Sequence, residues 1–223
     1  MLDFIASDVG KVVAGALIAF TGQIVVAVIA WAKEASTKKA VQRKEAEFLA
    51  FQLVVALERM VGEAYNAIHD PLIYLDEGEA NPTVANPKLN LPHGGDYKTL
   101  PAQLMYRVLS FPNRIIGMAE GMSAVAEHSG PPNYEEVFLY RREECAKLGL
   151  DGLAIIDDLC RKYAIPAPTR PKHYDPKEAF ERDLKKVQEE NNKLAEQRRR
   201  AWEMILTGHK AAGATQEKPS QGA

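Results

Sequence analysis

The hydrophobic positions of the chain are concentrated near its start. Residues 12–32, VVAGALIAFTGQIVVAVIAWA, contain no charged side chain, and only Thr21 and Gln23 are distinctly polar. A helix of that length spans about 30 Å, the thickness of the hydrocarbon core of a bilayer. Trp31 lies at one end, where an indole ring favours the membrane interface. The pattern predicts a transmembrane helix over 12–32, preceded by a short tail over 1–11.

A cleaved signal peptide and a buried core helix are the alternatives to a membrane anchor. Ala30-Trp31-Ala32 has the small-x-small form of a cleavage site. However, the apolar region of a signal peptide is only about 7 to 15 residues long and follows a positively charged segment. Here Asp3 and Asp8 precede the run, which is also longer, so the anchor is the favoured interpretation.

The rest of the chain has the patterns of helices, and no strand pattern is found. The segment 48–57, FLAFQLVVAL, is apolar nearly all round but too short to cross a bilayer, which predicts a buried helix core. Three further helices are predicted over about 100–128, 133–163 and 176–206. The expected fold class is all-α: an N-terminal transmembrane helix followed by a helical bundle over 33–164 and a C-terminal coiled-coil-like helix over 175–207.

Specific residues mark the expected ends and breaks of these helices. Pro112 predicts a kink or break in the first of the three, and Asn133 is a candidate N-cap for the second. Asp175 is the candidate N-cap of the third, with Pro176 at the first helical position.

Two proline-rich segments interrupt the helices. Segment 70–101 contains five prolines and predicts a long irregular loop that packs on the bundle through its apolar residues. Segment 165–174 contains three prolines and predicts a stiff hinge before the last helix. The final residues, 208–223, are small and polar, as is typical of a disordered tail.

The last helix carries a heptad pattern. Leu184 and Asn191 occupy a positions, while Val187 and Leu194 occupy d positions. An asparagine at a is a known device for fixing the register of a two-stranded coiled coil. These residues form a candidate oligomer interface, although the same spacing also suits packing against the protein's own bundle.

The predicted membrane helix has a face of small residues. Gly15 and Ala19 form a small-xxx-small pair, with Gly22 and Gln23 close to the same face. Such faces let helices approach closely and form hydrogen bonds in lipid. The two seams together favour a parallel homo-oligomer.

The distribution of charge predicts the orientation of the chain in the membrane and argues against nucleic acid as a partner. The chain has 28 basic and 30 acidic residues, a net charge of −2, so nucleic acid is not an expected partner. Five basic residues between Lys33 and Lys44 face a single acidic one, Glu34. By the positive-inside rule, the C-terminal domain is expected in the cytoplasm, with the N-terminus outside the cell (inner) membrane. The two cysteines are then expected to be reduced.

Candidate chemistry is sparse. The sequence has no Walker loop, GxGxxG, HExxH, GxSxG or CxxC motif, so no catalytic, metal or cofactor-binding residue is assigned. His69-Asp70 is read as a helix end followed by a turn. The carboxylate pairs Glu143-Glu144 and Asp157-Asp158 are read as solvated helix faces, and the basic run 198–200 as a solvated helix end that alternatively contacts anionic lipid.

These observations favour a single-pass membrane protein acting as a scaffold or protein-interaction module, with the bilayer, a further copy and another protein as partners. One alternative is an enzyme with a site between the bundle and loop 70–101, near Tyr74, His93 or Asp96. Another is a periplasmic envelope protein of reversed topology. The general outline is shared by phage lysis spanins, which require that reversed orientation, and no motif selects among these proteins.

Overall fold

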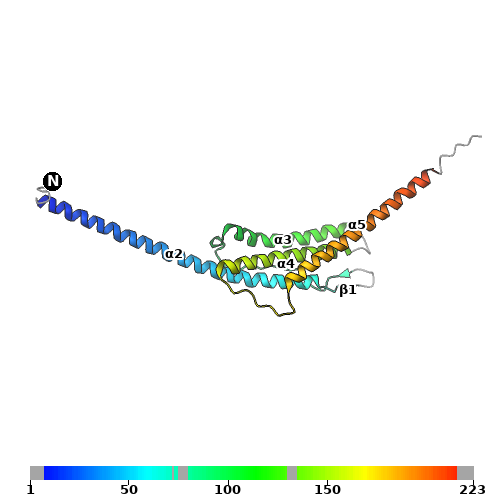
Figure 1. Cartoon of the computed structure of the whole chain (residues 1–223), viewed down its shortest axis with the longest axis horizontal. Coiled ribbons are helices and arrows are strands. Elements are labelled where there is room, and N and C mark those ends of the chain that lie inside the picture. Colours follow the sequence, from blue (N-terminus) through cyan, green and yellow to red (C-terminus); the bar gives the residue numbers. More distant parts are fainter. Residues whose placement is uncertain (1–7, 72, 75–79, 130–134, 215–223) are drawn as a thin grey trace, which may run out of the picture.

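The computed structural model describes the backbone of residues 8–71, 73–74, 80–129 and 135–214, and the side chains of 23, 26–71, 81–129 and 135–205. The described chain is all-α, as predicted. Its long helices are α2 (Asp8–Ile68), α3 (Ala102–His128), α4 (Glu135–Tyr163) and α5 (Pro176–Ala214) (Figure 1). Among the described residues, strand occurs only in an antiparallel pair, β1 (Ile73–Tyr74) with β2 (Ala80–Asn81). This pair was not predicted, because strands of two residues are too short to show an alternating pattern in the sequence.

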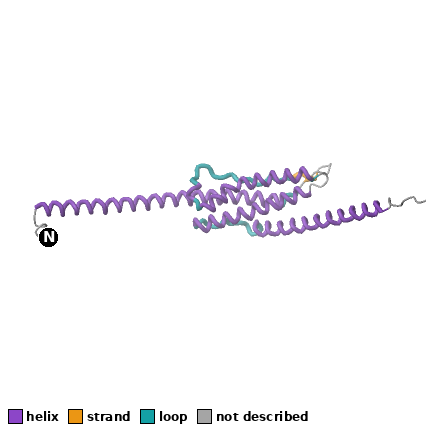
Figure 2. The backbone as a smooth tube through the Cα atoms, turned by 90° about the horizontal axis from the view of Figure 1, so that it is seen from above, coloured by secondary structure: helices purple, strands orange, loops and turns teal. Residues whose placement is uncertain are grey.

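The molecule is long because α2 and α5 extend beyond opposite ends of the bundle (Figures 1 and 2). Helix α2 is continuous through the predicted membrane segment and into the bundle, where its first buried residue is Ala46. The part of α2 before Ala46 is called the arm below. Side chains at 12–22, 24 and 25 of the predicted membrane segment lie outside the described residues. Within the residues that are described, no helix has both the length and the hydropathy of a membrane span.

Helix α4 is the central element of the bundle and contacts α2, α3 and α5. Its sequence predicted one side facing the core, but its buried residues lie on more than one side of the helix. Two glycines make the close packing possible. A Cβ atom on Gly149 would lie 2.2 Å from the ring of Phe180, and one on Gly152 would lie 2.6 Å from the Cε atom of Met60. Larger residues at these positions would push α5 and α2 away from α4.

Helix α2 packs through only part of its apolar circumference. Leu49, Leu53 and Leu57 are fully buried, as predicted for segment 48–57. By contrast, Phe48 and Phe51 are more than half exposed. The prediction of a buried core was therefore wrong for this side of the helix, because α4 and α5 pack on the opposite side.

The structure confirms the predicted N-cap of α5, but it shows no break at Pro112 and a later end of α5 than predicted. Pro112 lies inside α3 without ending it. The Asp175 carboxylate accepts a hydrogen bond from the backbone N–H of Glu178 at 3.1 Å, as an N-cap does. Helix α5 continues to Ala214, beyond the predicted end at 207. Asn133 and the rest of the predicted tail, 215–223, lie outside the described residues.

Both proline-rich segments contact the bundle. Segment 70–101 includes the short 3-10 helix η1 (Tyr97–Thr99) and buries Leu89 and Leu100 in the core, as expected for a loop that packs down. Segment 165–174 had been interpreted as a hinge. It is attached to α2 by an Arg170–Glu58 ion pair and by the ring of Tyr174, which packs edge-on against Tyr65.

Candidate functional site

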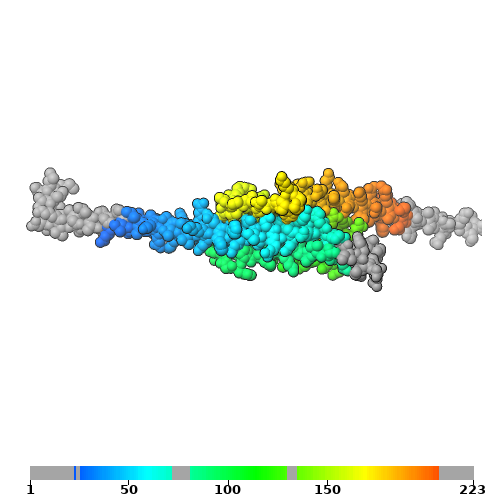
Figure 3. All heavy atoms as spheres, turned by 90° about the horizontal axis from the view of Figure 1, so that it is seen from below, coloured from blue at the N-terminus to red at the C-terminus, as the bar shows by residue number. Residues whose placement is uncertain are grey.

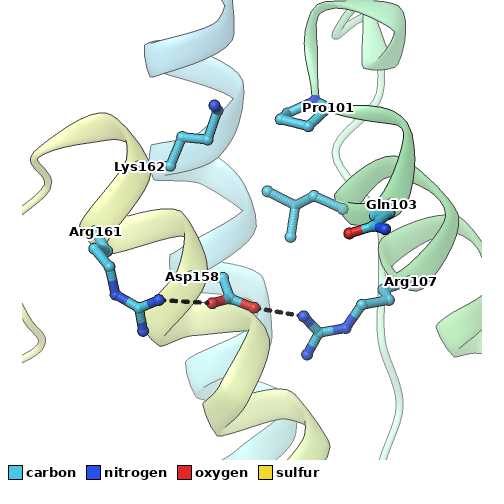
Figure 4. A pocket seen from close by; sticks show the side chains of 7 residues that line it. Pro101, Gln103, Arg107, Asp158, Arg161 and Lys162 are labelled. Carbon is cyan, nitrogen blue, oxygen red and sulfur yellow. Dashed lines mark hydrogen bonds and ion pairs between the residues drawn. The ribbon is translucent and has the colours of Figure 1, made fainter.

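A cavity of about 500 Å³ opens where α3 begins and α4 ends (Figure 4). Pro101, Gln103, Leu104 and Arg107 line it from α3, and Asp158, Arg161 and Lys162 line it from α4. It lies toward the end of the bundle from which the arm leaves (Figure 1), since Gly95 of the preceding loop lies against Leu49 at the start of the packed part of α2.

The cavity is cationic. Asp158 lies between two guanidinium groups, with its Oδ2 atom 2.5 Å from Arg107 and its Oδ1 atom 3.3 Å from Arg161 (Figure 4). Lys162 points toward the same opening and adds a third positive charge. Pro101, the N-cap of α3, makes no side-chain capping hydrogen bond, so the first N–H groups of α3 lack that partner. One carboxylate against three cations leaves a net charge of +2 (3 − 1) at the rim.

This arrangement is suited to holding an anion. Arg side chains bind carboxylate and phosphate oxygens in a planar fork, and a helix N-terminus favours negative charge. Arg107 and Arg161 are already oriented by Asp158, which restricts their motion and also neutralises part of their charge. The side chains that line the cavity are thus equipped for electrostatic binding.

A second polar cluster is buried under the loop 70–101. The Arg141 and Asp70 side chains are only 2% and 1% exposed, and they pair at 2.9 Å. Arg141 also donates to the Asn86 side chain at 2.9 Å and to the Val84 carbonyl at 2.5 Å. Asp70 accepts further hydrogen bonds from the Thr83 N–H and hydroxyl and from the Val84 N–H.

The protonation of Asp70 follows from this environment. Burial alone would raise the pKa of its carboxyl, but the hydrogen bonds from Thr83, Arg141 and Val84 outweigh burial and hold the pKa well below its usual value. The carboxylate therefore stays ionised at neutral pH. Sequence reasoning treated Asp70 as a turn residue and did not single out Arg141. The cluster fastens the loop to α4 and is structural in character.

Two of the three residues named for the alternative enzyme site have described side chains, and the structure gives them different surroundings. His93 lines a cavity of about 420 Å³ with Leu89, Tyr97 and Pro112, among others. Asp96 caps η1 by accepting a hydrogen bond from the Lys98 N–H at 3.0 Å. The side chain of Tyr74 lies outside the described residues.

Three of the four carboxylates in the two carboxylate pairs, those of Glu143, Glu144 and Asp158, form ion pairs on the helix surface. Glu143 and Glu144 both bind Lys147 at 2.8 Å, and Asp158 binds the two arginines of the cationic cavity. Among the described residues, no group of His, Cys, Asp and Glu has the arrangement of a metal site.

The candidate oligomer residues of α5 lie along its contact with the bundle. Val187 is buried in the core, and Leu184 is partly buried beside it. Asn191 and Leu194 line a cavity of about 330 Å³ with Tyr140 and Glu143 of α4. The first half of the seam thus packs on the protein's own bundle.

The candidate residues of the membrane segment are placed by the backbone alone. Gly15, Ala19 and Gly22 belong to the helical backbone of α2, but their side-chain surroundings lie outside the described residues. Gln23 is described and is exposed.

An exposed apolar stripe runs along α2. Val41, Phe48, Phe51 and Val55 form this stripe, here called the outer face, and their exposed fractions are 50%, 65%, 56% and 52%. Figure 3 shows α2, blue to cyan, uncovered along one side of the molecule. Single exposed apolar residues are common on proteins, but two phenylalanines three residues apart with a valine four residues later form a contiguous patch, which is typical of an interaction site. The sequence signal was present in segment 48–57, which is apolar nearly all round.

No protein-family model, curated protein or solved structure matches the chain.

Proposed function

We propose that this chain is a single-pass membrane-anchored scaffold whose cytoplasmic helical bundle binds other proteins. The observation that supports it best is the continuity of α2. One helix carries both the uncharged run 12–32 and, after the arm, the outer face with its exposed Phe48 and Phe51. A protein that holds an exposed apolar patch at a fixed distance from a bilayer is suited to recruiting partners there.

The proposed orientation is N-terminus outside and bundle inside. Lys33, Lys38, Lys39, Arg43 and Lys44 directly follow the uncharged run, and such a cluster is retained on the cytoplasmic side during insertion. All five lie on the exposed arm, where Lys38 pairs with Glu34 and Arg43 with Glu47. Exposed basic side chains that follow a membrane segment directly are suited to contact anionic headgroups.

Membrane anchoring is tested by alkaline extraction of membranes from expressing cells. The wild-type protein is expected in the membrane pellet. Ala19→Arg places a charge near the middle of the run, which costs about 3 kcal/mol on an insertion scale, and is expected to shift the protein toward the supernatant. Ala40→Arg is the matched control, because it adds the same charge to the exposed arm outside the run. Equal extraction of wild type and Ala19→Arg would contradict the proposed anchor.

Orientation is tested by protease treatment of spheroplasts with an epitope tag at the carboxyl end. Protection of the tag until the membrane is permeabilised is expected. Digestion in intact spheroplasts would support the periplasmic alternative with reversed topology instead.

The scaffold role is tested by purification of the tagged protein after solubilisation in mild detergent. At least one copurifying protein is expected in wild type, and its amount is expected to fall in Phe48→Glu, because a charge on the outer face weakens every assembly that depends on this face, including a pair of copies that binds the partner. Ile116→Glu is the control, because Ile116 is similarly exposed, at 56%, but belongs to α3. Absence of any copurifying protein with wild type would contradict recruitment of a different protein.

A further inference from the structure

The outer face of α2 has a geometry that suits a second copy of the same chain. At about 100° of rotation per residue, Phe48, Val55 and Val41 lie within roughly 80° of Phe51 around the helix axis. The fully buried Leu53, Leu57 and Met60 lie on the opposite side, against the bundle. The outer face is therefore a narrow apolar stripe that points away from every other helix of the same copy, as the contact seam of a paired helix does.

The same side of α2 continues toward the membrane segment. Phe51 and Gly15 are 36 residues apart (51 − 15), which is ten turns at about 3.6 residues per turn, so the two positions lie on one side of a straight helix. Position 19 lies about 40° from that line and position 22 about 20°. Val26, which is 67% exposed, lies about 20° from it. The small-residue positions and the outer face thus share one side of one helix.

We propose that two copies pair in parallel through this side of α2, with the outer face as the cytoplasmic part of the contact. The parallel direction depends on the proposed function, because copies inserted in one membrane with the same orientation present α2 in the same direction. Residues at the seam then meet their own counterparts across a two-fold axis, so Phe51 of one copy lies near Phe51 of the other.

The exposed area supports a contact that extends along the arm. With about 200 Å² per aromatic side chain, the exposed parts of Phe48 and Phe51 amount to roughly 240 Å² per copy, or about 500 Å² in a pair. A standard interface buries about 1,600 Å² in total. The remaining area would have to come from the arm, whose described side chains before Ala46 are almost all exposed in the single chain.

Two lysines on the same side affect the strength of pairing. Lys33 and Lys44 lie within about 20° of the Phe51 line, so the positive groups of two copies would approach one another. Their long aliphatic stems allow the ammonium groups to reach the edge of the contact. The remaining repulsion is weakened by salt, so pairing is expected to increase with ionic strength.

The test is cysteine cross-linking of the full-length protein in native membranes. Phe51→Cys is combined with Cys160→Ser, since Cys145 is buried and Cys160 is only partly so. Mild oxidation is expected to give a product of twice the monomer mass. Ile116→Cys in the same background is the control, because that exposed position lies on α3 and is expected to give little product.

A second measurement, the self-association of Phe48→Glu in detergent, tests pairing without relying on the cysteine at position 51. Phe48→Glu changes only an exposed side chain, so the bundle is expected to fold normally by circular dichroism. It is expected to weaken self-association in detergent about 30-fold or more, as loss of an interface hot spot does, whereas Ile116→Glu has no effect. The dimer signal is read by resonance energy transfer between labelled copies.

The outcomes separate this proposal from the proposed function. A membrane-bound protein with no product at position 51, or with equal product at 116, overturns pairing through the outer face and leaves anchoring intact. A protein that is extracted from membranes but still cross-links at 51 contradicts the anchor and supports pairing. Cross-linking of position 51 to a different protein alone overturns the second copy as occupant.

Discussion

Replacement of Arg141 by Met is expected to destabilise the protein strongly. The guanidinium is almost fully buried and donates to the Asp70 carboxylate, the Asn86 side chain and the Val84 carbonyl. Methionine has a similar length but no donor, so a buried carboxylate and two neutral acceptors lose a partner at once. Removing one member of a buried ion pair typically costs about 3 to 5 kcal/mol, because the remaining charge is left uncompensated. For a chain of this size that corresponds to a decrease in the unfolding midpoint of about 10 °C.

The measurement is thermal and urea unfolding of the purified full-length protein in detergent at pH 7, followed by circular dichroism. Arg161→Met is the matched control. Arg161 belongs to the same helix and also pairs with an aspartate, but its side chain is 76% exposed, so a change below about 1 kcal/mol is expected. Limited proteolysis within 70–101 adds a local readout, since Arg141 holds this loop on α4. A loss below about 0.5 kcal/mol in Arg141→Met, together with a loop that stays protected, would refute the reasoning.

The Arg141–Asp70 pair also predicts how the stability of the folded protein depends on pH. The pKa of Asp70 is lower in the folded protein than its unfolded value of about 3.9, so the folded state favours the ionised form. Its contribution is fully present above pH 4 to 5 and is lost as the pH falls toward the lowered folded-state pKa. Asp70→Asn is therefore expected to be less stable than wild type at pH 7 and to show a shallower loss of stability below pH 4. If wild type and Asp70→Asn lose stability equally as the pH falls below about 4, a group other than Asp70 controls the acid sensitivity.

Three further substitutions or reactions follow from the packing. Gly149→Ala places a methyl group against the Phe180 ring, so overpacking of about 1 to 3 kcal/mol is expected to exceed the gain in helix propensity and lower the unfolding midpoint; an increase would contradict the packing argument. Ala164 follows α4 with φ = 52°, so Ala164→Gly is expected to stabilise the protein by about 0.5 to 1 kcal/mol in urea unfolding, and a destabilisation of that size would refute it. Burial raises the pKa of the Cys145 thiol to about 12, so mass spectrometry after maleimide treatment at pH 8 is expected to show Cys160 modified and Cys145 unmodified until urea is added; early labelling of both would contradict this.

The helices were predictable from sequence because their signals are local. Asp175 and Pro176 define the start of α5 from three or four neighbouring residues, and the structure contains the expected capping bond. The effect of Pro112 was harder to predict. Proline lacks the N–H of a helical hydrogen bond, so whether the helix continues depends on packing by the neighbouring residues. Helix α3 continues through it while Phe111 remains buried against the core.

The Arg141–Asp70 cluster could not be predicted from a single sequence. The two residues are 71 positions apart, and Asp70 follows a helix end, where an aspartate is ordinary. The chain contains 28 Lys and Arg residues, and nothing local marks Arg141 as the buried one. Its position follows from the path of loop 70–101, which returns across α4 and brings Val84 and Asn86 to the same place.

The exposure of the outer face could not be predicted from the sequence for a different reason. Segment 48–57 is apolar nearly all round and was predicted to be buried, but only one side of it is. Which side remains exposed depends on where α4 and α5 pack, and that is set by contacts far along the chain. Gly149 brings α5 close to α4, and Gly152 brings α2 close to α4. Helices α4 and α5 therefore cover one side of α2 and leave Phe48 and Phe51 exposed on the other.

The cost of unpacking distinguishes the two surfaces considered for self-association. Val187 of the heptad seam of α5 and Phe180, one heptad before it, are both almost fully buried against the same copy. A second copy that used this part of the seam would first have to displace α4, which means exposing two side chains whose burial is worth about 1.5 to 3 kcal/mol each. The outer face of α2 requires no such rearrangement, since its phenylalanines are already in solvent. Between two apolar seams on one chain, the one that can be covered without opening the bundle is the better candidate for pairing, and for this reason the proposed contact is on α2.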